Sequence, residues 1–141
     1  MKKGFVILQP SIILTTIAIA LLAVNPGIFS SVIQNEKAKE VAQNFRNLKA
    51  AIENYWNTDK PTPPTAAIGA AQLVPGYINA IPANFTISNP TAVAGQPGVY
   101  SITIVYKGCD VDVKKVREYG MLDVYEENGY IKLTFYLQKW W

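Results

Sequence analysis

The first pattern along the chain is an apolar run that contains no charged side chain. It extends from Phe5 to Val24 and follows Lys2 and Lys3. As a helix, a run of about 20 apolar residues crosses the hydrocarbon core of a bilayer, and the lysines ahead of it would stay in the cytoplasm. A secretory signal with a cut after Ala20 is the alternative, although the apolar region of such signals is normally shorter.

The second pattern is a helical periodicity that continues after Pro26. Its apolar positions recur in steps of three and four and form one stripe, made of Val41, Phe45, Leu48, Ile52 and Tyr55. We therefore predict one long helix over residues 5–57, apolar all round in 5–25 and amphipathic in 26–57. A bend is expected at Pro26, where a backbone donor is missing. No domain of this size can cover such a helix, so its first half must be buried by lipid or by other copies of itself.

Residues 58–141 are predicted to form a globular domain of loops and an antiparallel sheet. The alternation of β-branched and aromatic residues in 99–106 indicates a strand. Residues 121–137 indicate two further strands around a tight turn at Asn128-Gly129, because this dipeptide favours the positive φ values of such turns. The sheet would have three or four strands, and its inner face would cover the apolar stripe of the helix.

Shorter segments connect these elements. A short helical or irregular segment is expected to direct four apolar side chains inward: Leu73, Tyr77, Ile78 and Ile81. Residues 87–98 read as a loop. In 110–120 the spacing of Val113 and Val116 favours a short helix that ends at Gly120. Hydrophobic and polar residues alternate at the start of this segment, so a strand is the alternative. The predicted fold class is α+β: a long N-terminal helix packed on a small C-terminal antiparallel β-sheet.

Composition narrows the classes of function. The 141 residues carry a formal charge of +3, of which Lys2 and Lys3 supply two units, and half of the residues are hydrophobic. This balance excludes a disordered chain and does not predict a nucleic-acid-binding surface. The chain has no histidine, the usual general base and the commonest metal ligand. No catalytic motif is present, so we predict no enzyme activity and no cofactor.

Few residues suggest chemistry of their own. Asp110 and Asp112 are weak candidates for a calcium site, and solvated loop charge is the simpler interpretation. Cys109 is the single cysteine and is expected to be a small buried hydrophobe, with a free thiol or an intermolecular bridge as alternatives. Of Trp140 and Trp141, one ring is expected to cap the sheet core; the alternative is an exposed aromatic end that packs against another subunit.

The first half of the chain resembles the type IV pilin and pseudopilin superfamily. The resemblance is carried by "KKGF" at 2–5, the apolar run, Pro26 and the amphipathic continuation that ends in "AAIENYW", and it covers residues 1–57. It implies a leader of residues 1–4 that a dedicated prepilin peptidase removes between Gly4 and Phe5. Phe5 would then become the N-methylated first residue, and Pro26 would be the helix-bending proline that many pilins carry.

The resemblance also implies a function and a location. The chain would be a structural subunit of a type IV pilus-like or type II secretion-like filament. As a precursor it would cross the inner or cytoplasmic membrane once, with its N-terminus inside. After cleavage it would join other copies of itself and related pilins on an assembly platform in the membrane, in a filament that is extracellular or periplasmic. Lipid is the partner before assembly, and no nucleic-acid partner is implied.

Gln9 departs from the family pattern. At this position the family usually has a glutamate, thought to pair with the N-terminal amine of a neighbouring subunit. Glutamine still accepts a hydrogen bond, but it cannot neutralise a buried ammonium. Gln9 would therefore be a weaker docking contact, which supports a minor or tip subunit that primes assembly. A single-pass membrane protein with an extracytoplasmic binding domain is the remaining alternative.

Overall fold

A computed structural model describes the backbone of residues 26–141 and the side chains of residues 32–141. The predicted apolar half of the long helix, residues 5–25, lies outside the described residues. The amphipathic half is one helix, α2, which runs from Pro26 to Asp59 and so ends slightly beyond the predicted residue 57. No helix within residues 26–141 is both long and apolar enough to cross a membrane. Residues 38–141 form one compact unit, and the packing that follows lies within it.

The buried face of α2 is the predicted apolar stripe. Its five side chains are all buried, from Val41 at the first turn of the compact unit to Tyr55 near the helix end. Four further residues widen this face: Ala38, Ala42, Ala51 and Trp56. Burial of this face against the sheet stabilises the helix, since propensity alone rarely does so.

The sheet has five strands rather than the three or four expected. Two long antiparallel strands form its centre, β3 at Val99–Tyr106 and β5 at Tyr130–Gln138. The short strand β4, Tyr125–Glu127, pairs with β5, and the strand order is β1-β3-β5-β4. β1 at Phe85–Ile87 and β2 at Thr91–Ala92 both pair with β3. The expectation of an unpaired loop over 87–98 was therefore wrong at its start and at Thr91–Ala92.

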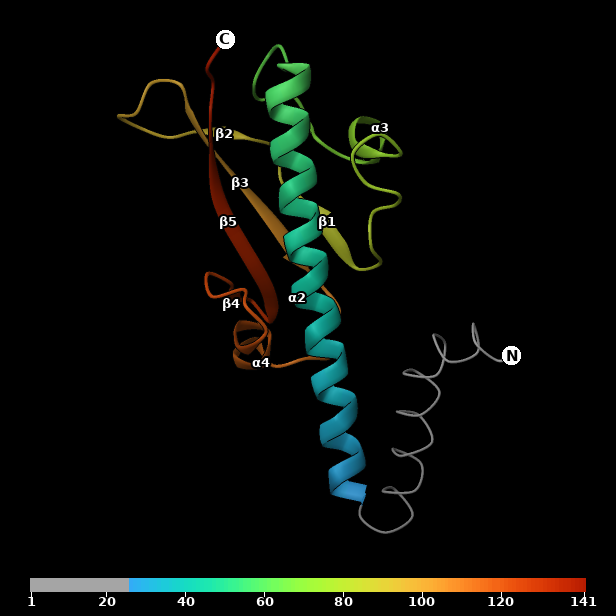
Figure 1. Cartoon of the computed structure of the whole chain (residues 1–141). Helices are drawn as coiled ribbons and strands as arrows, with labels where there is room; N and C mark the ends of the chain where they lie inside the picture. Colours follow the sequence, from blue (N-terminus) through green and yellow to red (C-terminus); the bar gives the residue numbers. More distant parts are fainter. Residues whose placement is uncertain (1–25) are drawn as a thin grey trace, which may run out of the picture. The chain divides into compact units, whose positions relative to one another are not determined.

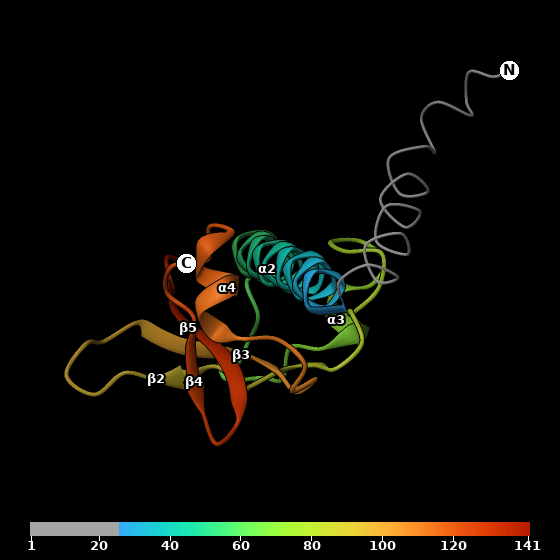
Figure 2. The same cartoon turned by 90° about the horizontal axis from the view of Figure 1, so that it is seen from below.

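The core lies between α2 and one face of the sheet. Alternate residues of β3 and β5 point to α2 and are buried: Ile102, Ile104, Tyr106, Ile131, Leu133, Phe135 and Leu137. Phe45 of α2 meets Phe85 of β1 edge to face, with ring centroids 5.0 Å apart. Two perpendicular views show α2 lying across this face (Figures 1 and 2). The predicted helix-on-sheet α+β class is confirmed for this part of the chain.

The connections follow the sequence signals closely. A short helix, α3, spans Ala70–Leu73; Leu73 is buried, and Tyr77, Ile78 and Ile81 pack against the core as predicted. The segment before β4 contains α4, Val113–Glu118, followed by Gly120 with a φ of 105°, so the helical interpretation was right. Positive φ values at Asn128 and Gly129 close the β4–β5 turn. β4 begins only at Tyr125, later than the predicted start near Met121.

Candidate functional site

The residues that the resemblance marks for processing and docking are Gly4, Phe5 and Gln9. All three lie outside the described residues. Pro26 is the first residue of α2 in the described part of the chain. A bend there depends on the residues before it, so the bend remains a prediction.

Asp110 and Asp112, the weak metal candidates, each have a protein partner. Asp112 caps the N-terminus of α4, where its side chain accepts a hydrogen bond of 2.9 Å from the amide of Lys114. Asp110 accepts a hydrogen bond of 2.5 Å from the hydroxyl of Tyr106. Among residues 32–141 no group of three or more histidine, cysteine or acidic side chains is placed to hold a metal ion. Both carboxylates therefore have structural roles at the end of β3 and the start of α4.

The Tyr106 phenol is the most strongly perturbed titrating group of this region. Burial raises its pKa well above the ordinary value, and the hydrogen bond to Asp110 and the negative charges of Asp110 and Glu40 raise it further. Gly108 lies directly against the ring, so closely that a Cβ at this position would overlap the phenol. The turn after β3 thus needs a glycine to fit over Tyr106.

Cys109 is exposed, so the expectation of a small buried hydrophobe was wrong. The residue has a φ of 56°, a left-handed conformation in the turn after β3, which places its side chain at the surface. Its thiol donates a weak hydrogen bond of 3.5 Å to the main-chain oxygen of Gly129. Sequence reasoning used the usual burial of cysteine and could not see the backbone conformation of this turn.

A cluster of aromatic rings connects the end of α2 with the end of the chain. Trp56 is 1% exposed, and its ring lies 5.2 Å from that of Trp141 and 5.7 Å from that of Tyr100, centroid to centroid. Its indole nitrogen donates a hydrogen bond of 2.9 Å to the main-chain oxygen of Gln138. Trp141 packs against the core, as the first interpretation of the C-terminal tryptophans predicted. Trp56 was missed, although its spacing of four residues from Ile52 could have placed it on the buried stripe.

Trp140 lies outside the core, with 56% of its surface exposed. Three contacts nevertheless hold its ring. The indole nitrogen donates a hydrogen bond of 3.2 Å to the side-chain oxygen of Asn57, and the ammonium of Lys60 lies 4.7 Å from the ring centroid. The ring of Trp141 meets it edge to face at 6.0 Å.

An open groove of about 440 Å³ lies beside Trp140, between α2 and β5. α2 contributes Glu53, Asn54, Trp56 and Asn57 to its lining, and the other side consists of Tyr136, Leu137, Gln138 and Trp140. Tyr136 is 64% exposed. In Figure 1 the end of β5 that leads to the C-terminus lies at the same end of the fold as the last turns of α2. This is a surface where aromatic and polar side chains meet.

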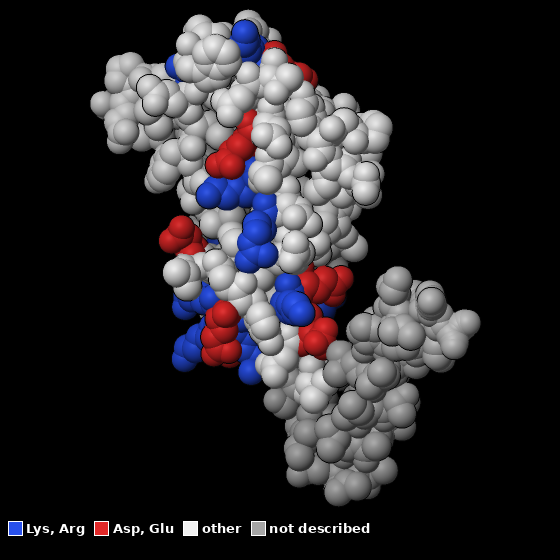
Figure 3. All heavy atoms as spheres, in the orientation of Figure 1, with Lys and Arg blue, Asp and Glu red and all other residues white. Residues whose placement is uncertain are grey.

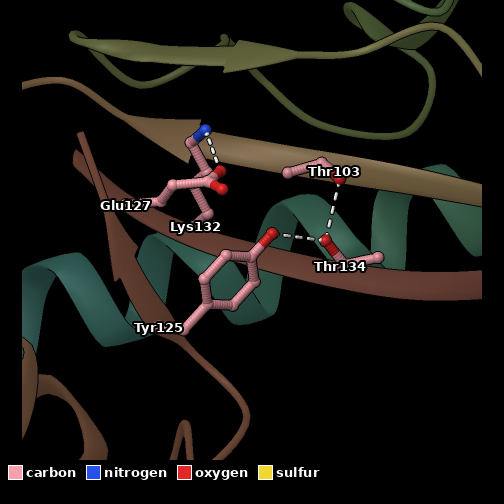
Figure 4. A network of polar contacts seen from close by, with 5 residues as sticks. All are labelled: Thr103, Tyr125, Glu127, Lys132 and Thr134. Atoms are coloured by element: carbon pink, nitrogen blue, oxygen red, sulfur yellow. Dashed lines mark hydrogen bonds and ion pairs between the residues drawn. The ribbon is translucent and has the colours of Figure 1, made fainter.

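The outer face of the sheet is joined by polar contacts between three strands. Thr134 of β5 shares hydrogen bonds of 2.8 Å with Thr103 of β3 and Tyr125 of β4 (Figure 4). Lys132 and Glu127 form an ion pair of 2.7 Å across the β4–β5 hairpin. Because each hydroxyl has a partner within the sheet, these residues stabilise strand pairing.

Charge on the visible face is mixed. Basic and acidic side chains are interspersed over this face and gather together near the lower end of the described surface (Figure 3). On this face the two signs lie close together (Figure 3).

Comparison with known proteins gave no match: no family model, no curated protein and no solved structure matched the chain. The function therefore has to be inferred from the sequence pattern and from the geometry of the described residues.

Proposed function

We propose that the chain is a structural subunit of a type IV pilus-like or type II secretion-like filament, which polymerises through its N-terminal helix after prepilin peptidase cleavage. The observation that carries the proposal is the combination in residues 2–26: a basic leader, a Gly-Phe junction, a charge-free run and a proline. The α+β unit supports it, because α2 follows this apolar run in the sequence and the buried side chains of its residues 32–59 are all hydrophobic.

The mechanism is a change of surroundings for the apolar helix. In the precursor, residues 5–25 lie in lipid; in the filament, the same residues pack against the equivalent residues of other copies. Lipid tails are as apolar as leucine side chains, so this exchange gains little from the hydrophobic effect. Close helix packing must supply the contacts, and a separate ATPase at the assembly platform supplies the work. The globular units would form the outer surface of the filament.

Gln9 favours a second candidate within the same machinery, a minor or tip subunit. A subunit that lacks the acid gains less from docking onto the amine of a neighbour inside an apolar core. Abundance distinguishes the two roles: a purified filament composed mainly of this chain would indicate the major subunit. A filament that contains it in trace amounts, and fails to form without it, would indicate the priming role.

The processing step provides the test. The full chain is expressed with and without a prepilin peptidase, and the N-terminus of the membrane-extracted product is determined by mass spectrometry. We expect loss of residues 1–4 and a methylated Phe5 only when the peptidase is present. Gly4→Ala should still be processed, and Gly4→Val should not, because the peptidase needs a small residue at this position. A chain that stays uncut would indicate a single-pass membrane protein, and a cut near Ala20 a secreted domain.

A further inference from the structure

The side chain of Trp140 is exposed, and its ring is nevertheless held in place by neighbouring residues. The ring is held by Asn57, Lys60 and Trp141, while more than half of its surface stays exposed. A rigid aromatic ring loses little conformational entropy when a ligand packs on it. The restraint therefore prepares the indole for contact with something outside the fold.

The groove beside the ring offers polar groups in addition to the aromatic surface. Asn54 and Glu53 present an amide and a carboxylate from α2. On the other side, β4 pairs with residues 130–132 of β5, so the outer edge of β5 has no strand partner beside Tyr136 and Gln138. The main-chain oxygen of Gln138 is bonded to the indole of Trp56, so the backbone groups that this edge offers to a ligand are those of Tyr136. A ligand here would meet aromatic rings together with amide, backbone and carboxylate groups that can hydrogen-bond.

The groups that line the groove favour a sugar over a nucleic acid or a protein as the ligand. A sugar ring has apolar C–H faces that pack on aromatic rings, and hydroxyl groups around its rim that donate to carboxylate and amide oxygens. A nucleic acid also stacks on aromatic rings, but Glu53 is the charged residue of the groove lining and would repel its phosphates. A protein interface would bury an apolar centre depleted in charge, whereas the lining of this groove includes three amide side chains and a carboxylate.

We propose that the groove between the last turns of α2 and the free edge of β5 binds a neutral saccharide, with Trp140 as the stacking surface and Glu53 and Asn54 as hydrogen-bonding partners of its hydroxyl groups. Tyr136 lines the same groove and provides a second aromatic contact. The volume of about 440 Å³ falls in the range of small-molecule sites. The proposal concerns residues 53–57 and 136–140 and stands whether or not the chain polymerises.

The test uses the full chain in micelles of a detergent without a sugar headgroup, because glycoside detergents would compete for the groove. The probes are four neutral disaccharides: lactose, cellobiose, maltose and N,N′-diacetylchitobiose. Tryptophan fluorescence reports binding at the indole, and saturation-transfer NMR reports which sugar protons contact the protein. We expect at least one disaccharide to bind saturably, with a dissociation constant of about 1 mM or lower, and its C–H protons to receive the saturation.

Variants assign the binding to the groove. Trp140→Ala should weaken it by about tenfold, equivalent to about 1.4 kcal/mol, Trp140→Phe should weaken it less, and Glu53→Gln should weaken it without changing the fold. Leu122→Ala is the matched control, because this side chain is 75% exposed and does not line the groove. Thermal unfolding of each variant shows that the fold is retained.

Three results would overturn the proposal. The first is no saturable response to any of the four disaccharides. The second is binding that Trp140→Ala leaves unchanged. The third is a response of the groove to a different partner: an oligothymidylate that binds through Trp140, or self-association in analytical ultracentrifugation that Trp140→Ala abolishes in the absence of sugar.

Discussion

The indole nitrogen of Trp56 donates a hydrogen bond of 2.9 Å to the main-chain oxygen of Gln138, which lies 82 positions further along the chain. The bond joins the last turns of α2 to the end of β5. A buried indole has a single donor, and Gln138 is the final residue of its strand, so the bond fixes how far α2 extends along the sheet. The apolar stripe of α2 therefore packs against the inward side chains of β3 and β5 at one fixed position along the helix axis.

This bond predicts a difference between two tryptophans that touch each other. Trp56→Phe should lower the free energy of unfolding by about 2 kcal/mol, because it removes the donor to Gln138 and leaves part of the volume of the buried indole unfilled. Trp141→Phe should cost less than about 1 kcal/mol, because the indole nitrogen of Trp141 is buried without a partner among the described residues. Thermal and denaturant unfolding of the full chain in micelles measures both. Equal losses in the two variants would show that the hydrogen bond contributes nothing.

The stripe on α2 should be the most sensitive surface of the helix. Phe45→Ala should lower the free energy of unfolding by about 3 to 5 kcal/mol, because Phe45 is fully buried and contacts Phe85. Asn47→Ala, an exposed position on the same helix, should change it by less than about 0.5 kcal/mol. The same unfolding measurement applies. A comparable loss at both positions would contradict the assignment of the buried face.

Because Gly108 lies against the ring of Tyr106, even the methyl group of alanine at position 108 should destabilise the fold. Gly108→Ala should lower the free energy of unfolding by about 1 to 3 kcal/mol, because the added Cβ displaces a buried ring that is hydrogen-bonded to Asp110. Gly76→Ala is the matched control, since nothing lies near the added Cβ there. Equal free energies of unfolding for the two variants would contradict the close packing of Gly108 against Tyr106.

Alkaline pH should destabilise the fold through Tyr106. Its pKa is raised by burial first and by the bond to Asp110 second, so the folded state keeps a proton that the unfolded state releases above the ordinary value of 10.0. The contribution of Tyr106 to stability is therefore complete below pH 10 and is lost as the pH rises through that value towards the raised pKa. Tyr55 and Tyr77 shift in the same direction.

Melting temperatures measured from about pH 9 to about pH 11 test this linkage. Tyr106→Phe should be less stable at neutral pH, because it loses the bond to Asp110, and its melting temperature should fall less steeply with pH than that of the wild type. The same slope in both proteins would mean that another group causes the alkaline loss.

Much of the described fold could be predicted because the sequence patterns of single elements match the residues that the fold buries. The period of the stripe, the alternation in Val99–Tyr106 and the Asn128-Gly129 turn each act over a few residues. β1 and β2 could not be predicted in the same way. They have three and two residues, their partner is β3, and pairing with a strand further along the chain leaves little pattern in so short a segment.

The surface features depend on contacts that no local pattern shows. Asn57 and Trp140 meet only because α2 and β5 end side by side. The exposure of Cys109 follows from a left-handed backbone conformation, which is uncommon for residues other than glycine. The groove beside Trp140 likewise arises from residues far apart in the sequence.

The central claim is that residues 5–25 remain part of the mature protein as the core of a filament. Intact-mass spectrometry of filaments sheared from cells that express the chain with its peptidase and assembly platform tests it most directly. We predict the mass of residues 5–141 with one methyl group added. A filament that lacks this chain, or that contains it without residues 5–25, would contradict the account.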